Sequence, residues 1–263
     1  MSAEDREIQL TLVGGPTVLI GWHGVSLLTD PTFDDAGGKY GVEPFQLSKT
    51  LGPAVPTDDL PPVDAVLLSH DQHSDNLDAA GRALLSRVPL VLTTPEGAQR
   101  LGPPSRPLKT WESTMIKGPK GDLRVTSTPA RHGPAGIEPV AGPVTGFAVE
   151  DSAGTGIYVT GDTVFFDGVA ETSRRFQPLL VVAFAGAARV RGPFDLTLSV
   201  GDLLEIAAAF PQALIVPVHI DGWAHFTQGE AEIRRGFAAL GAESRLAFLE
   251  PGKTRRFALP NLE

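Results

Sequence analysis

Histidine is the residue type whose placement in this sequence most clearly suggests chemistry. The chain of 263 residues has six histidines and no cysteine, so a transition-metal site would have to use imidazole and carboxylate ligands. Three histidines, His70, His132 and His219, follow apolar segments closely. Strand ends hold imidazole rings rigidly, and the adjoining loops leave a coordination position open. The placement predicts a metal site at one edge of a sheet, although a single histidine more often has a structural role.

Carboxylates and amides accompany the first of these histidines. Residues 70–76, HDQHSDN, contain two imidazoles, two carboxylates and two amides, which are groups that bind divalent cations. A polar turn is the alternative interpretation, with Asp75 or Asn76 as the N-cap of the next helix. A further carboxylate, Asp162, lies at the glycine turn that follows the apolar segment 156–160.

The elements that must position these residues follow from hydrophobic patterning. Glycine-punctuated apolar segments open the chain and predict a β-meander. From residue 64 onward, strand and helix patterns alternate, which favours one α/β domain over residues 1–263, with mixed sheets covered by helices. The expected strands cover residues 8–13, 17–20, 25–29, 64–69, 89–93, 123–128, 144–150, 156–160, 179–184 and 213–218. The expected helices cover 77–86, 95–101, 200–210 and 233–240, with Ser199 as an N-cap and Thr227 with Glu230 as a capping box.

One long segment has no regular pattern. Residues 30–63 are rich in proline, glycine and aspartate. A stretch of this length more often forms a functional loop or lid than a linker. A loop beside the substrate is therefore one expectation for it, weighed evenly against a connection without such a role.

Composition excludes several classes of function. With 31 acidic and 22 basic residues the formal net charge is −9, which disfavours a nucleic-acid or anionic-membrane partner. No segment approaches the roughly 20 apolar residues of a membrane span. Residues 1–9 lack the pattern of a secretory signal, so a cytoplasmic location is expected. These features say nothing of the oligomeric state.

Taken in order, these segments resemble the metallo-β-lactamase superfamily over nearly the whole chain. The LLTDP stretch at 27–31 is similar to the branch that contains L-ascorbate 6-phosphate lactonase and N-acyl-phosphatidylethanolamine phospholipase D, in which the aspartate matching Asp30 is structural. The ligand motif H-x-H-x-D-H of the family falls at 70–76, its third histidine at His132, its bridging aspartate at Asp162 and its last histidine at His219. The resemblance implies an αββα sandwich: two mixed β-sheets flanked by helices, with a metal site at one edge.

The central motif departs from the family pattern. A one-residue insertion, H-x-x-H-x-D-N, keeps His70, His73 and Asp75 and places Asn76 where the final histidine belongs. An amide is a poorer ligand than imidazole for zinc or iron, so the second metal position should be weakened. Either the protein holds one metal firmly, or another residue replaces the missing ligand. His225 is the candidate, although it could instead cap a helix or bind substrate, whereas His23 matches no landmark and is expected at the surface.

The resemblance implies a metal-dependent hydrolase that acts on a small ester, lactone, amide or phosphoester. His70, His73 and His132 would hold a metal that activates water, and Asp162 and His219 would hold a second. Asp75, also a ligand, and His225 are the candidate catalytic residues. Zinc is the expected metal, as one or two ions, with manganese or iron as alternatives. A non-catalytic binding protein with a degenerate metal site is the alternative, motivated by Gln72 and Asn76.

Two further groups of residues have open roles. Arg131, Arg189 and Arg191 could meet an anionic part of the substrate or lie solvated at the surface. Phe165 and Phe166, after the glycine turn at 161, could form an apolar wall of the pocket or belong to the core.

Overall fold

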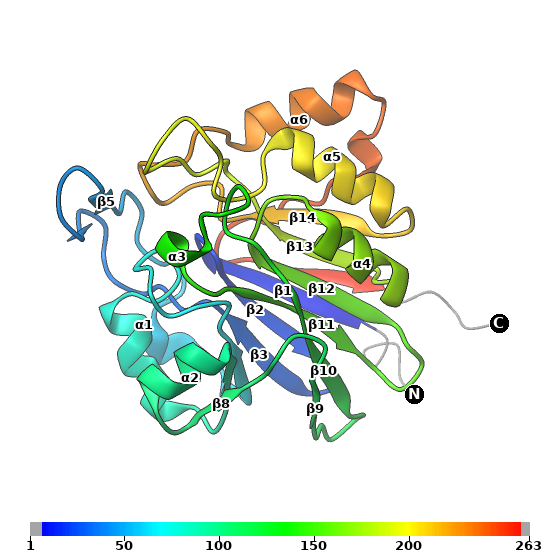
Figure 1. Cartoon of the computed structure of the whole chain (residues 1–263). Coiled ribbons are helices and arrows are strands. Elements are labelled where there is room, and N and C mark those ends of the chain that lie inside the picture. The colour runs from blue at the N-terminus through cyan, green and yellow to red at the C-terminus, as the bar shows by residue number, and fades with distance from the viewer. Residues whose placement is uncertain (1–6, 259–263) are drawn as a thin grey trace.

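Two β-sheets packed face to face form the body of the protein. The computed structural model describes residues 7–258. Helices lie on the outer faces of the sheets, which gives the predicted αββα sandwich (Figure 1). The first sheet contains, in spatial order, β15 (Thr254–Ala258), β1 (Glu7–Gly14), β2 (Thr17–Trp22), β3 (Val25–Thr29), β6 (Ala65–Leu67), β7 (Val91–Thr93) and β8 (Ser105–Pro107). The second contains β14 (Leu214–Val218), β13 (Leu180–Phe184), β12 (Gly156–Asp162), β11 (Thr145–Glu150), β10 (Leu123–Pro129) and β9 (Ser113–Ile116).

Both sheets mix parallel and antiparallel pairs. The first begins as an antiparallel meander and continues in parallel from β3 through β6, β7 and β8. In the second, β12, β13 and β14 are parallel, and β10 runs in the same direction because it is separated from β12 by the antiparallel β11. The carboxyl ends of β10, β12 and β14 therefore meet at one edge of this sheet. Binding sites of open α/β sheets lie at such ends.

Strand alternation explains the two cores around the second sheet. In β13, Val182 and Phe184 face the first sheet, whereas Val181 and Ala183 face the outer helices. Side chains of a strand alternate between faces, and a strand covered on both sides reads as a continuous apolar run such as LVVAF. The outer core packs against α4, α5 and α6 (Figure 1). The helices are α1 (Ala79–Leu84), α2 (Pro95–Leu101), α3 (Glu138–Ala141), α4 (Asp167–Arg175), α5 (Val200–Ala209) and α6 (Glu230–Ala239).

Most predicted elements are present with small shifts at their ends. Ser199 is the N-cap of α5, and it forms a capping box with Asp202. The capping box predicted for Thr227 and Glu230 is wrong, because α6 begins after Gly229 and Glu232 closes its first turn. The hydroxyl of Thr227 instead donates to the carbonyl of Ala187 at 2.7 Å. The elements missed are mostly short or polar: the hairpin of β4 (Lys39–Tyr40) and β5 (Leu47–Ser48), the strands β8, β9 and β15, the helices α3 and α4, and three short 3-10 helices, η2 (Thr57–Asp59), η3 (Leu85–Arg87) and η4 (Glu243–Arg245).

The N-cap of α1 is Asp78, so the proposed caps Asp75 and Asn76 are wrong. One Asp78 carboxylate oxygen accepts from the backbone N–H of Gly81, and the other accepts from Lys49 Nζ at 2.8 Å. The backbone N–H groups of Phe33 and Asp34 also donate to this carboxylate. Asp78 therefore fixes both ends of residues 33–49 against α1.

The β4–β5 hairpin protrudes from the body near the upper loops (Figure 1). Its base is joined to the loop after β14 by an isolated bridge between Lys49 and Trp223. The backbone N–H groups of Thr50 and Ala224 complete this junction by donating to Gly222 at 2.8 Å and to Ser48 at 3.0 Å. The long segment from 30 to 63 is thus an ordered part of the upper edge.

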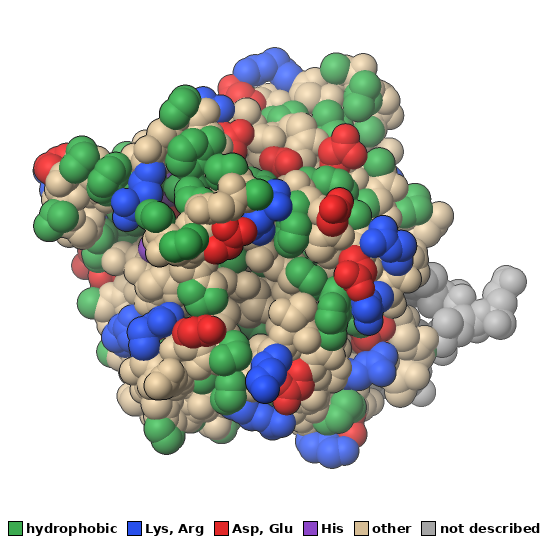
Figure 2. Space-filling view, viewed as in Figure 1, with side chains coloured by type: hydrophobic (Ala, Val, Ile, Leu, Met, Phe, Trp, Pro, Cys, Tyr) green, Lys and Arg blue, Asp and Glu red, His purple; other side chains and the backbone are tan. Residues whose placement is uncertain are grey.

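Within residues 7–258, no helix has both the length and the apolar character needed to cross a membrane. Figure 2 shows acidic and basic side chains interspersed over one face, with hydrophobic side chains gathered around the hairpin and the neighbouring upper loops. The prediction that residues 1–9 lack a secretory signal falls mostly on residues 1–6, which lie outside the described residues. The prediction of a single domain over 1–263 likewise includes residues at both ends that are not described.

Gly81 in α1 allows a close approach of the chain. A Cβ added there would overlap the carbonyl oxygen of Pro31 and lie 2.6 Å from its carbonyl carbon. We expect Gly81→Ala to lower the free energy of unfolding by about 2 kcal/mol, because backbone atoms would have to move. Urea denaturation measures this change. Gly201→Ala in α5 is the matched control: its Cβ would meet only ordinary contact at 3.6 Å, and it should be neutral or stabilising. Equal effects at the two positions would contradict the steric explanation.

Candidate metal centre

Six predicted site residues come from strand ends and the loops that follow them, at one edge of the sandwich. His70, His73 and Asp75 lie between β6 and α1, and His132 follows β10. Asp162 ends β12, and His219 follows β14. The strands β10, β12 and β14 of the second sheet and β6 of the first sheet deliver these side chains to a common region.

The first group consists of three imidazoles. His73 Nδ1 lies 3.0 Å from His70 Nε2 and 3.1 Å from His132 Nε2. His70 and His132 are buried and His73 is half-buried. Three ring nitrogens that converge this closely have the spacing of ligands to a single metal ion, for which metal–nitrogen distances are about 2.0–2.1 Å.

Hydrogen bonds behind the rings orient these nitrogens. The Ser69 hydroxyl donates to Asp30 at 2.6 Å, so at its contact with His70 Nδ1, 2.8 Å away, the ring N–H is the donor. His132 Nδ1 donates to the carbonyl of Leu196 at 2.7 Å. In both rings the proton lies on Nδ1, which leaves the lone pair of Nε2 directed to the centre.

The second group contains Asp75, Asp162, His219 and His225. His225 Nε2 lies 3.0 Å from Asp75 Oδ2, and His219 Nε2 lies 3.7 Å from the same oxygen. The two carboxylate oxygens of Asp162 face different groups: Oδ1 is 3.6 Å from His219 Nε2, and Oδ2 is 3.6 Å from His132 Nε2. Asp162 thus stands between the two groups.

The charge state of the site suits metal ligation. Burial lowers the pKa of His132 and of His219 to about 3, and it holds the pKa of His70 well below its usual value. These rings are therefore neutral at physiological pH, which is the form that binds metal. Burial alone would raise the pKa of Asp75, but His225 and the other imidazoles around it lower that pKa.

Asp162 tests whether the residues fit a cation. The residue is fully buried, and within residues 7–258 neither carboxylate oxygen has a well-formed hydrogen bond. Burial, with the nearby carboxylates of Asp75 and Asp30, raises the pKa of Asp162 well above its usual range. Such a carboxylate is costly in a protein interior unless a cation compensates it. The donor set around Asp162 therefore fits metal ions.

Asn76 and Gln72, the two departures from the family motif, have structural partners. Asn76 Nδ2 donates to the buried Asp30 carboxylate at 3.2 Å. Gln72 Nε2 donates to the carbonyls of Ala141 at 3.1 Å and Pro143 at 2.9 Å. Gln72 thereby ties the loop that carries His70 and His73 to the segment at the end of α3, a contact that the sequence did not indicate.

Two expectations about the remaining residues change. His23 was expected at the surface and is instead buried, with its Nε2 3.5 Å from Asp151, because the turn folds back against the body. Phe165 and Phe166 pack against the core under the outer helices, so they belong to the core and do not form a wall of the pocket.

Of the three arginines considered for substrate binding, only Arg191 lines the pocket at the centre. Arg189 pairs with Asp195 at 2.7 Å, and Arg131 stacks on Phe166 at 4.6 Å. Arg189 and Arg131 are thus held by partners outside the pocket, whereas Arg191 faces the site.

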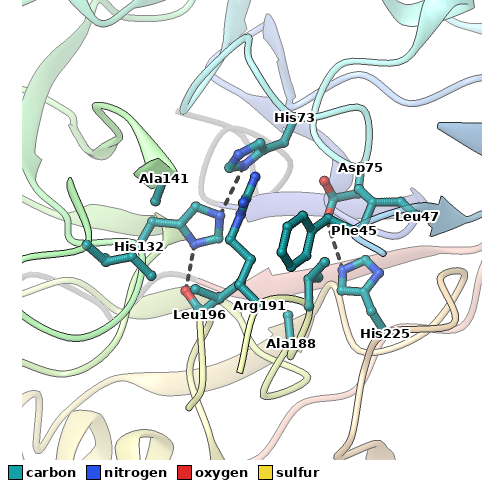
Figure 3. Close-up of a pocket in the computed structure, with 12 residues that line it drawn as sticks. Phe45, Leu47, His73, Asp75, His132, Ala141, Ala188, Arg191, Leu196 and His225 are labelled. Atoms are coloured by element: carbon teal, nitrogen blue, oxygen red, sulfur yellow. Dashed lines mark hydrogen bonds and ion pairs between the residues drawn. The ribbon is translucent and has the colours of Figure 1, made fainter. Parts of the chain in front are cut away.

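The pocket over the two groups is partly open to solvent, and the space between its walls is about 530 Å³ when that open part is included. Its walls come from the hairpin, from α3 and from the loop after β13, and Figure 3 shows their side chains around His73, His132, Asp75 and His225. The sequence did not identify these walls, although the long segment from 30 to 63 pointed to the hairpin. The apolar lining residues are Phe45, Leu47, Ile137, Ala141, Ala188, Val190 and Leu196.

Comparison with known proteins gives matches that cover most of the chain. A family model described as a beta-lactamase superfamily domain matches residues 26–220. The UPF0173 protein YddR of Bacillus subtilis (strain 168) is 24% identical over 263 residues, which cover 95% of this chain and 100% of that protein.

Solved structures share the fold over nearly their whole length. An isothiocyanate hydrolase from Delia radicum gut bacteria superposes with a TM-score of 0.81 and 25% identity, covering 95% of this chain and 99% of that one. A possible metal-dependent hydrolase from Veillonella parvula DSM 2008 gives a TM-score of 0.81 and 22% identity, covering 94% and 98%. The lactonase and phospholipase branch suggested by LLTDP stays a prediction, as does the cytoplasmic location. The match over residues 26–220 establishes that the chain belongs to the metallo-β-lactamase superfamily, and these structures share its fold.

Proposed function

We propose that this protein is a binuclear metal-dependent hydrolase of small, largely apolar substrates. The observation that carries the proposal is the Asp162 carboxylate, buried without a well-formed hydrogen bond between two groups of ligand-type side chains. His70, His73 and His132 would hold one ion, and Asp75, His219 and His225 would hold the other. Asp162 would contact both.

His225 replaces the histidine that the family motif has at the position of Asn76. It lies beside Asp75, 3.0 Å away, although it comes from the loop after β14. In this proposal Asn76 donates a hydrogen bond to the buried Asp30 carboxylate, and His225 supplies the imidazole ligand of the second ion.

Bound zinc would lower the pKa of water toward neutrality and polarise the bond to be cleaved. The chain's own residues supply the remaining requirements. Asp75, whose Oδ2 lies 3.0 Å from His225 Nε2, would orient the attacking water by accepting a hydrogen bond from it. The apolar walls exclude bulk water and orient the substrate above the two groups.

The substrate class follows from the lining of the pocket. A small ester, lactone, amide or phosphoester with an apolar body would fill it, and the similarity to an isothiocyanate hydrolase adds an isothiocyanate to the compounds worth assaying. Imidazole and carboxylate ligands suit zinc, and manganese and iron are the other candidates. The first experiment is therefore an assay of these compound classes with protein loaded with each metal.

Metal stoichiometry tests the role of His225. We expect the purified wild-type protein to hold about two equivalents of metal per chain and His225→Ala to hold about one, because the second group loses an imidazole ligand. Elemental mass spectrometry measures both values. Asp221→Asn, on the same loop, is the matched control and should keep both equivalents. Equal metal content in wild type and His225→Ala would contradict this role, and a wild-type protein that binds no metal even after incubation with zinc, manganese and iron(II) would favour a non-catalytic binding protein.

A further inference from the structure

Arg191 is the one cationic side chain among the described residues that line the pocket. It comes from the loop after β13, and its Cζ lies 4.4 Å from the centre of the Phe45 ring. Figure 3 shows the side chain extending past Phe45 toward His73. The guanidinium is therefore held at the pocket by stacking on the hairpin.

No carboxylate within residues 7–258 forms an ion pair with Arg191. Its neighbour Arg189 differs in this respect, because Asp195 neutralises it. An arginine presents several N–H donors in a planar fork that matches an oxyanion, and no hydrogen-bond acceptor among residues 7–258 uses this fork in Arg191.

The charge around Arg191 determines what the fork would bind. If the proposed function holds, two divalent cations outweigh the carboxylates of Asp75 and Asp162, so the loaded centre is positive. A guanidinium beside a positive centre is unfavourable unless a negative group lies between them. Elsewhere the pocket is apolar, and the net charge of the whole chain is −9, so this attraction to anions is local.

We propose that Arg191 is the specificity-determining residue for an oxyanion on the substrate, a carboxylate, sulfonate or phosphate, and that the substrate therefore combines an apolar body with one anionic group. This inference rests on the proposed function and names its substrate class. The apolar body packs against Leu47, Ile137 and Leu196, and the oxyanion accepts hydrogen bonds from the guanidinium.

A pair of probes that differ in charge and hardly in shape tests the proposal. Phenylacetate and phenylacetamide are titrated into the metal-loaded protein, and the quantity measured is the ratio of their dissociation constants. We expect wild type to prefer phenylacetate and Arg191→Gln to reduce this preference about tenfold, since a charge-assisted pair is lost. Arg191→Lys should keep part of the preference, because it keeps the charge and loses the fork.

Arg189→Gln is the matched control, since it removes one positive charge two residues away and should leave the preference unchanged. An unchanged preference in Arg191→Gln would overturn the proposal, and so would an equal weakening of both probes, which would indicate lost packing. Hydrolysis is scored separately. A protein without hydrolytic activity whose preference still depends on Arg191 refutes the proposed function and keeps the oxyanion subsite, whereas an active hydrolase with no dependence on Arg191 refutes the subsite alone.

Discussion

Replacing His132 with alanine is expected to reduce kcat/KM by about a thousandfold or more and to lower the metal content. His132 Nε2 faces both His73 and Asp162, so its loss opens the first group and removes the neighbour of one Asp162 oxygen. The loss of a bound metal removes the activation of water, on which hydrolysis in the proposed mechanism depends. Steady-state kinetics with an active substrate and elemental analysis of the same preparation measure both effects.

His23→Gln is the matched control for this experiment. His23 is also a buried histidine beside a carboxylate, but it lies at the turn between β2 and β3, outside the metal centre. It should keep its metal and most of its activity. If His132→Ala turned over substrate normally in a metal-free preparation, the metal-dependent mechanism would be refuted.

Replacing Asp78 with alanine is expected to lower the free energy of unfolding by about 3–5 kcal/mol. The Asp78 side chain is 0% exposed and its partner Lys49 is 3% exposed, at 2.8 Å. Removal of the carboxylate leaves the ammonium group buried without a partner, and it also removes the cap of α1. Urea denaturation followed by circular dichroism measures the change.

Two further variants separate the buried charge from other effects. Asp58→Ala breaks an ion pair with Arg87 in which the carboxylate side chain is 86% exposed, and it should change stability by less than about 0.5 kcal/mol. The double variant Lys49→Met with Asp78→Asn removes both charges and should be more stable than Asp78→Ala. A double variant that is no more stable would show that the unpaired charge is not the cause.

Local patterns in the sequence are sufficient to predict most of the fold. The strand LVVAF and the glycine-punctuated meander are recognisable because hydrophobic periodicity determines which faces are buried. The N-cap at Ser199 was also predicted from a local pattern, because serine is a preferred N-cap immediately before an apolar periodic segment. Helix α4 was missed because only Val169 and Thr172 of its nine residues are buried, so it has little apolar pattern to read.

The site was predictable where single residues follow strands, and not where partners come from distant loops. His70, His132 and His219 were identified because each follows an apolar strand, and the face-to-face packing of the two sheets brings these strand ends together. Their roles as ligands stay proposals. The position of His225 beside Asp75 and the contact of Gln72 with Pro143 depend on how two loops pack, for which no short-range pattern exists. The pocket walls have the same origin, since Phe45 and Leu196 are far apart in the chain.

The bridge between Lys49 and Trp223 separates two tasks within the hairpin region. The base of the hairpin is fastened to the loop that carries His219 and His225, and it is anchored a second time by Asp78. The tip, residues 41–46, projects beyond these attachments and presents Phe45 to the pocket. We therefore expect changes in the length or sequence of the tip to alter which molecules enter the pocket without moving His219 and His225. The tip is a short segment that can be exchanged to change substrate selection while the centre below it stays the same.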